Sequence, residues 1–128
     1  MKIGVVGAGA VGGYYAAKLL RDGAEVHLLL RGDYETVQTR GLQIQTAESE
    51  FTVHPHAHAS PETIGECHLV LVGLKTTAND RFAELITPLV GKDTAILCLQ
   101  NGLGNCEQLA EIFAPEKIMA GLCFVCLN

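Results

Sequence analysis

Positive charge and long apolar runs are both scarce in this sequence of 128 residues. Nine lysines and arginines stand against 14 aspartates and glutamates, which gives a formal net charge of −5 at pH 7. This balance leaves no basic face for nucleic acid. Apolar stretches such as residues 69–74 are far shorter than the roughly 20 residues that a membrane-spanning helix needs. We therefore expect neither nucleic acid nor a membrane as a partner.

The cysteines do not form a convincing disulfide set, because their number, five, is odd. Four of them lie in or beside apolar runs: Cys67, Cys98, Cys123 and Cys126. We interpret them as small buried hydrophobic residues in a reducing compartment. Cys123 and Cys126 have C-x-x-C spacing, but positions three apart in a strand point to opposite faces, so no metal or redox site is expected there. Glycines from Gly7 onward interrupt the apolar start too early for a signal peptide, and the predicted location is cytoplasmic.

Three histidines alternate along residues 54–58: His54, His56 and His58. In an extended chain they would share one face, a spacing that is compatible with a metal ion. Pro55 disfavours a regular central strand, and no carboxylate lies among the histidines. We expect an exposed edge or loop here, and no metal site.

Strand-like and helix-like segments alternate along the chain, and no repeat, linker or low-complexity segment divides it. Strands are predicted at residues 2–6, 25–30, 68–72 and 94–99, with one or two more within 117–127. Helices are predicted at 11–22 and around 82–89, with a kink or restart at Pro88. A third is predicted to run to about 113, with Asn105 as its N-cap and Gln108 as the capping-box partner. A hairpin at 41–46 and 50–53 and a helical turn opened by Ser60 and Pro61 complete the pattern. The alternation predicts a single α/β domain of the Rossmann type, a doubly wound, mostly parallel sheet in three layers with helices on both faces.

Residues 7–12 read Gly-x-Gly-x-x-Gly directly between the first strand and the first helix. In that context the pattern indicates a dinucleotide site. Gly7 permits the sharp turn, Gly9 lets a pyrophosphate approach the backbone, and Gly12 lets the helix pack against the sheet. The free N–H groups at the start of the helix would then face the phosphates.

The residue that ends the second strand favours NADP over NAD. An acidic residue normally binds the ribose 2′-hydroxyl of NAD at this position, but here it is Arg31. A cation would attract the 2′-phosphate of NADP through charge-assisted hydrogen bonds. Asp33 follows two residues later and keeps NAD open as an alternative.

Three features together resemble the ketopantoate reductase (2-dehydropantoate 2-reductase) family. They are the glycine motif at 7–12, Arg31, and the pair formed by Gly-Leu-Lys-Thr at 73–76 and Gln-Asn-Gly-Leu-Gly-Asn at 100–105. The resemblance runs over the whole chain but covers only the amino-terminal half of the family. It implies hydride transfer from NADPH to 2-dehydropantoate, a small-molecule 2-oxo acid, giving pantoate for pantothenate biosynthesis.

The resemblance also implies roles for single residues. The pyrophosphate would lie at the glycine turn, against the backbone of Gly9, Ala10 and Val11, and Arg31 would bind the 2′-phosphate. Lys75 would lie near the cofactor ribose. Asn101 would lie between the nicotinamide ribose and the substrate. A solvated loop lysine and a simple Asn-Gly turn are the alternative interpretations of the last two.

No catalytic residue is assigned in this chain, because the family's general acid belongs to a second, helical domain that the sequence lacks. We expect cofactor binding with little turnover, and self-association through apolar surface near residues 122–127. A fragment of a longer protein and a naturally short product both stay open. So do a dehydrogenase for another 2-oxo or hydroxy acid and a dinucleotide-sensing module without chemistry.

Overall fold

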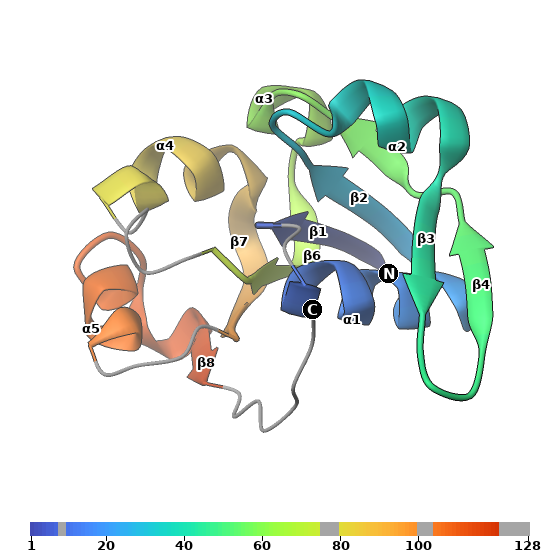
Figure 1. Ribbon diagram of the computed structural model, residues 1–128. Helices are drawn as coiled ribbons and strands as arrows, with labels where there is room; N and C mark the ends of the chain where they lie inside the picture. Colours follow the sequence, from blue (N-terminus) through green and yellow to red (C-terminus); the bar gives the residue numbers. More distant parts are fainter. Residues whose placement is uncertain (8–9, 75–79, 100–103, 121–128) are drawn as a thin grey trace.

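The computed structural model describes residues 1–7, 10–74, 80–99 and 104–120. Its main sheet has six strands in the order β5-β2-β1-β6-β7-β8, and every neighbouring pair is parallel (Figure 1). From β1 the chain builds outward on one side through β2 to β5, and on the other through β6 and β7 to β8. This order confirms the predicted doubly wound topology. The strands are β1 (Lys2–Val6), β2 (Glu25–Leu29), β5 (His56–His58), β6 (Cys67–Val72), β7 (Val90–Cys98) and β8 (Ile118–Ala120).

Seven short helical segments and one hairpin surround the sheet in the part that the structure describes. The hairpin pairs β3 (Leu42–Gln45) with β4 (Glu50–Val53) in antiparallel register, as predicted. The helical segments are α1 (Ala10–Arg21), α2 (Tyr34–Arg40), α3 (Pro61–Ile64), α4 (Phe82–Ile86), η2 (Thr87–Leu89), α5 (Asn105–Ala110) and η3 (Pro115–Lys117). None of the described helices is long and apolar enough to cross a membrane.

Helices lie on both faces of the sheet, which gives three layers. Val5 and Val6 are adjacent in β1 but belong to different buried clusters, because successive side chains of a strand point to opposite faces. The Val5 cluster includes Ala16 of α1 and Val37 of α2. The Val6 cluster takes in side chains from three helices, namely Ile64, Phe82, Ile86 and Leu109. Both faces of β1 are therefore buried, as its continuous apolar run predicts.

One glycine inside β1 serves this packing. A Cβ at Gly4 would lie 2.6 Å from Cδ2 of Leu89 and 2.9 Å from Sγ of Cys67. The bare backbone lets the η2 turn approach the centre of the sheet. Leu89 is fully buried as a result.

Several predicted boundaries were wrong. The α5 helix begins at Asn105, and the residue in the N-cap position is Gly104, whose φ of +89° suits glycine. Asn105 is therefore the first residue of the helix and not its N-cap, and Gly104 has no side chain with which to cap it. The helix ends at Ala110, short of residue 113. The α2 helix was not predicted, and β7 begins four residues earlier than expected.

Of the predicted final strands in residues 117–127, only residues 117–120 are described. The strand β8 falls within the predicted range 117–127. Cys123 and Cys126, and the segment 122–127 proposed for self-association, belong to the part that is not described. Cys67 and Cys98 are free and buried, in agreement with their interpretation as core residues.

Two of the three alternating histidines form a polar cluster at the β5 edge with a third from β2. Nδ1 of His27 and Nε2 of His58 are 2.9 Å apart, and Nε2 of His27 lies 2.7 Å from a carboxylate oxygen of Glu25. His56 stacks on His27 with 4.5 Å between ring centroids. Nδ1 of His58 is 2.8 Å from the hydroxyl of Thr63 in α3.

His54 lies apart from this cluster, with its ring beside Gly41. His54, His56 and His58 therefore do not come together in one cluster. Among the described residues, no group of three or more His, Cys, Asp or Glu side chains is placed to hold a metal ion.

The histidine cluster predicts a loss of stability in mild acid. Burial, together with the charges of His27, His56 and Lys2, lowers the pKa of His58 below its usual 6.5. The unfolded chain then binds a proton at this residue more readily than the folded chain does, so the free energy of unfolding falls as the pH drops through about 6.5. Chemical denaturation at a series of pH values between about 7 and 5 measures this dependence. We expect His58→Gln to flatten it.

His54→Gln is the matched control, because His54 is exposed and outside the cluster. The His54 variant should keep the slope of the unmodified chain. Identical slopes for the His58 variant and the unmodified chain would contradict the prediction.

Candidate functional site

The carboxyl ends of β1 and β6 come together at a turn that has no room for side chains. Gly7 leaves β1 with a φ of +93°, and a Cβ there would lie 2.5 Å from the backbone nitrogen of Leu74. A Cβ on Gly12 would lie only 2.0 Å from the carbonyl oxygen of Gly7. Gly73 closes the group, since its N–H donates to the carbonyl of Val6 at 2.8 Å. Three backbone segments thus meet where a parallel sheet of this kind forms its ligand crevice.

The sequence predicted a sharp turn at Gly7 and close helix packing at Gly12, and the structure has both features. Ala10 and Val11 are the first two residues of α1, and their backbone lies in the first turn of that helix. That turn contains no acidic residue. Gly9 lies outside the described residues, and contact of this turn with a pyrophosphate stays a prediction.

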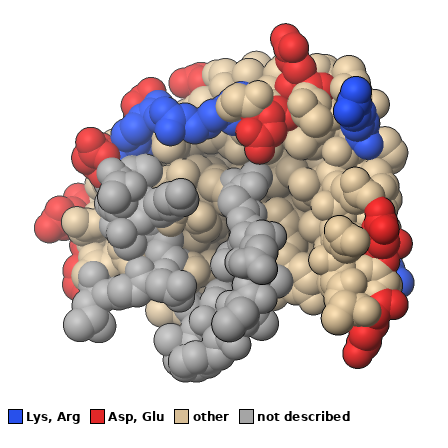
Figure 2. All heavy atoms as spheres, in the orientation of Figure 1, with Lys and Arg blue, Asp and Glu red and all other residues tan. Residues whose placement is uncertain are grey.

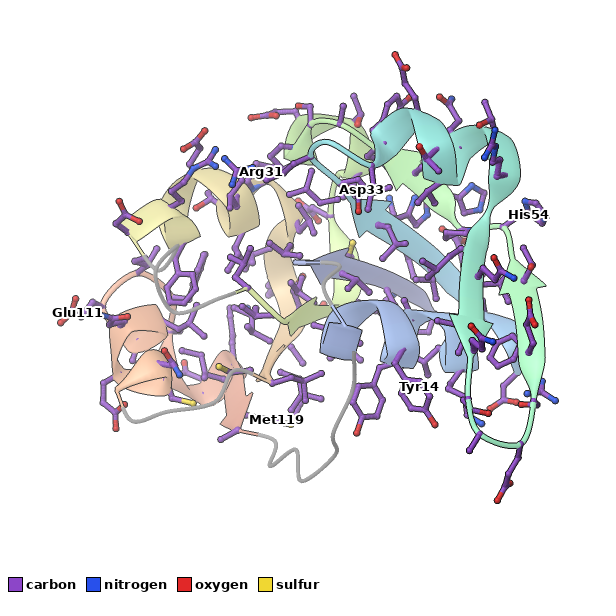
Figure 3. All side chains as sticks on the ribbon, viewed as in Figure 1. Tyr14, Arg31, Asp33, His54, Glu111 and Met119 are labelled. Atoms are coloured by element: carbon purple, nitrogen blue, oxygen red, sulfur yellow. The ribbon has the colours of Figure 1, made fainter. Side chains whose placement is uncertain are left out.

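The end of β2 supplies an exposed cation. Arg31 follows Leu30, whose N–H donates to the carbonyl of His58 at 2.9 Å and so continues the pairing with β5 to the edge of the crevice. Figure 3 shows the Arg31 side chain pointing from this loop toward α4. The β2 and β6 strands flank β1, so the loops that follow them lie on either side of the glycine turn.

Asp33, the alternative acidic residue, lies in the N-cap position of α2. It lines a surface hollow of about 550 Å³ between α2 and the β3–β4 hairpin, together with Arg40 and Thr52. The hollow is lined mainly by α2 and the hairpin, with Gly32 from the loop after β2, while Arg31 points toward α4 (Figure 3).

A charged pair at the start of α4 adds to the electrostatics of the crevice. Nη2 of Arg81 lies 3.1 Å from one carboxylate oxygen of Glu84, and its Nε lies 3.3 Å from the other. The hydrogen bonds and charge of Arg81 lower the pKa of Glu84, and the charge of Arg31 lowers it further. Glu84 therefore lies within the field of both arginines. Figure 2 shows basic side chains in a band that extends over α4 and the loop after β2.

Sequence reasoning did not single out Arg81 and Glu84. The available signal was an Arg and a Glu three residues apart at the start of a predicted helix, a spacing that places side chains together on a helix face. Nothing in the sequence alone related that pair to Arg31, because 50 positions separate the two arginines in the chain (81 minus 31).

Two further predicted site residues, Lys75 and Asn101, lie outside the described residues. The strands that precede them are described. Leu99 N donates to the carbonyl of Val72 at 2.8 Å, so the chain leaves β6 and β7 side by side. The roles of Lys75 and Asn101 stay predictions.

Comparison with known proteins gives a consistent family. The family model described as "Ketopantoate reductase PanE/ApbA" matches residues 3–128. The 2-dehydropantoate 2-reductase of Nostoc sp. is 43% identical over 128 residues, which span 99% of this chain and 40% of the Nostoc protein. The crystal structure of the 2-dehydropantoate 2-reductase from Geobacter metallireducens has a TM-score of 0.98 and 52% identity, covering 100% of this chain and 43% of that one.

A third similar structure carries a different name. A D-mandelate dehydrogenase in ternary complex with NADH and anilino(oxo)acetate has a TM-score of 0.86 and 26% identity, with 95% of this chain and 40% of that chain covered. In each of these comparisons the chain spans about two fifths of the relative's length. The family match itself extends over nearly every residue, and the sequence motifs, the sheet order and the relatives agree. The chain belongs to the ketopantoate reductase PanE/ApbA family.

Proposed function

We propose that this chain is the dinucleotide-binding part of an NADPH-dependent reductase that converts 2-dehydropantoate to pantoate. The observation that carries the proposal is the glycine turn. Side chains are sterically excluded at Gly7 and Gly12, immediately before and within the start of α1. A backbone kept bare at a helix start, at the carboxyl ends of parallel strands, suits a pyrophosphate.

The residues around the turn fit a dinucleotide. The backbone of Gly7, Gly9, Ala10, Val11 and Gly12 would hold the pyrophosphate. The first turn of α1 contains no acidic residue. No carboxylate there offsets the positive end of the helix dipole. An anion at that position therefore meets free N–H donors and no local repulsion.

Arg31 supports the preference for NADPH. The 2′-phosphate of this cofactor lies on the adenosine ribose, which a Rossmann fold holds beside the end of its second strand. Arg31 occupies that position and is exposed, so its guanidinium is available to a phosphate. No acidic residue stands there to accept a hydrogen bond from the 2′-hydroxyl of NADH.

Lys75 and Asn101 are proposed to contact the nicotinamide end, near the ribose and the substrate. When bound, a reduced nicotinamide supplies the hydride for the substrate carbonyl. This chain would position that cofactor, and the general acid is assigned to no residue within it. We accordingly propose that the chain alone binds NADPH and turns over slowly. Its free buried cysteines suit the reducing conditions of the cytoplasm.

A second candidate is a dehydrogenase for a different 2-oxo acid. The D-mandelate dehydrogenase relative, named in complex with NADH, favours it, because 40% of that chain is similar to this one although its named substrate and cofactor differ from those proposed here. Fold similarity does not fix the substrate. Nucleotide preference distinguishes the two candidates in part.

Removing the Arg31 cation should weaken NADPH binding and leave NADH binding unchanged. A charge-assisted hydrogen bond to phosphate contributes about 1.5–3 kcal/mol, so we expect Arg31→Ala to raise the Kd for NADPH about 10- to 100-fold. Calorimetric titration of the purified chain with each nucleotide measures both constants. Arg40→Ala, which removes the same charge from the far end of α2, is the control.

Each alternative outcome has a definite meaning. Equal affinities for the two nucleotides, unaffected by Arg31→Ala, would contradict the NADPH preference and favour the second candidate. Binding of neither nucleotide would overturn the assignment of the glycine turn.

Adding a side chain within the glycine turn should weaken the binding of NADPH and of NADH equally. In Gly12→Ala the new methyl group would lie 2.0 Å from the Gly7 carbonyl oxygen, so the turn and α1 must move apart. Overpacking of this kind costs about 1–3 kcal/mol of stability. We expect a lower Tm by calorimetry and equal weakening of NADPH and NADH.

Gly32→Ala is the matched control for stability, because a Cβ there meets nothing within 4 Å. Unchanged binding of both nucleotides by folded Gly12→Ala protein would show that the pyrophosphate lies elsewhere.

A further inference from the structure

We propose that Arg81 is a second cation for the 2′-phosphate, acting with Arg31, and that Glu84 holds Arg81 in place and weakens NADPH binding by its own charge. This inference rests on the proposed function, since it concerns the same nucleotide. It adds two specificity-determining residues on a different element, α4, to the single arginine at the end of β2.

The first support is geometric. The two oxygens of Glu84 accept hydrogen bonds from Nη2 and Nε of Arg81, at 3.1 and 3.3 Å. Two contacts from one carboxylate fix the plane of the guanidinium, so Arg81 is oriented before any ligand arrives. A guanidinium carries five N–H donors, and these two contacts use two of them. The remaining N–H groups are the donors that would bind a phosphate oxygen.

The second support is electrostatic. Arg81 and Arg31 both lower the pKa of Glu84, with Arg81 the stronger influence, so this carboxylate feels both cations. Glu84 and the neighbouring Asp80 in turn raise the pKa of Arg81. Arg31, Arg81 and Asp80 are thus charged neighbours around the start of α4, and Glu62 of α3 is a further carboxylate within the field of Glu84.

The third support is the position in the fold. Arg31 follows β2, and Arg81 lies in the segment between β6 and α4. These strands lie on either side of β1 and its glycine turn. Figure 3 shows Arg31 pointing toward α4, and Figure 2 shows the basic band that spans the two elements. A phosphate bound by Arg31 on the side that faces α4 would therefore lie between two cations.

Glu84 has two opposing effects in this arrangement. It orients Arg81, which favours the phosphate, but its negative charge repels the same phosphate. Its side chain is 64% exposed and that of Arg81 is 33% exposed, so water weakens both effects. The net expectation is a moderate gain in NADPH affinity when the Glu84 charge is removed and the hydrogen-bonding shape is kept.

Nucleotide titrations of single and double variants test the proposal. Arg81→Gln should raise the Kd for NADPH about fivefold, a value suited to a half-exposed charge contact, and leave the Kd for NADH unchanged. Glu84→Gln should lower the Kd for NADPH and again leave NADH unchanged. In the Glu84→Gln background, Arg81→Gln should have a smaller effect, because no unpaired carboxylate is left beside the phosphate. All NADPH effects should shrink as salt is added.

Arg40→Gln is the matched control, since it removes the same charge from a helix on the other side of the Arg31 loop. The ratio of the two Kd values distinguishes ligand contact from a structural role, because a loosened α4 would alter NADPH and NADH alike. Thermal unfolding of each variant checks that α4 stays folded.

Three results would overturn the inference. An unchanged Kd for NADPH in Arg81→Gln, alongside a clear loss in Arg31→Ala, would leave Arg31 as the phosphate cation and exclude Arg81. Equal weakening of both nucleotides would assign Arg81 a purely structural role. Failure of the unmodified chain to bind either nucleotide would instead refute the proposed function, and this inference with it.

Discussion

The close approach of three backbone segments around Gly7, Gly12 and Gly73 is the constraint on which the rest of this structure depends. A carbonyl oxygen occupies the space that a Cβ of Gly12 would need, so the first helix can start only where it does. That start fixes α1 against the central strand, and α1 in turn supplies Ala16 to the core on its face of the sheet. The same contact sets the N-terminus of α1 at the carboxyl ends of β1 and β6. Core packing and the shape of the crevice therefore have one origin.

Charge is distributed so that this crevice can be selective although the chain is acidic overall. The formal net charge is −5, yet the loop after β2 and the start of α4 both present arginines to one region. An acidic protein repels anions in general, so a local concentration of cations is the feature that would attract one. The carboxylate of Glu84 keeps one of these cations oriented.

The sequence predicted those parts of the fold that have strong local signals. The β1 strand, the glycine turn and α1 combine an apolar run, a required backbone conformation and helical periodicity, and all three were located within a residue or two. The α2 helix was missed because it has one buried residue, Val37, and hence no apolar stripe. The early part of β7 was missed because residues 91–93 resemble a loop.

The extended form of residues 91–93 depends on contacts with residues that are distant in the sequence. Thr94 donates from its hydroxyl to the Cys67 carbonyl at 2.6 Å, and Lys117 donates to the Gly91 carbonyl at 3.0 Å. The same limit applies to the site. Arg31 follows from a motif, whereas the electrostatic effect of Arg31 on Glu84 exists only once β2 and β6 flank β1.

The three-residue length of β5 has a consequence for the behaviour of the protein at high concentration. An edge strand offers unpaired N–H and C=O groups to any strand of a neighbouring molecule, which makes long, flat edges prone to aggregation. Here the edge is short, and Pro55 immediately before it has no N–H to offer. The imidazole rings of His56 and His58 pack beside the ring of His27 at this edge. This side of the sheet is therefore a poor template for growth by strand addition.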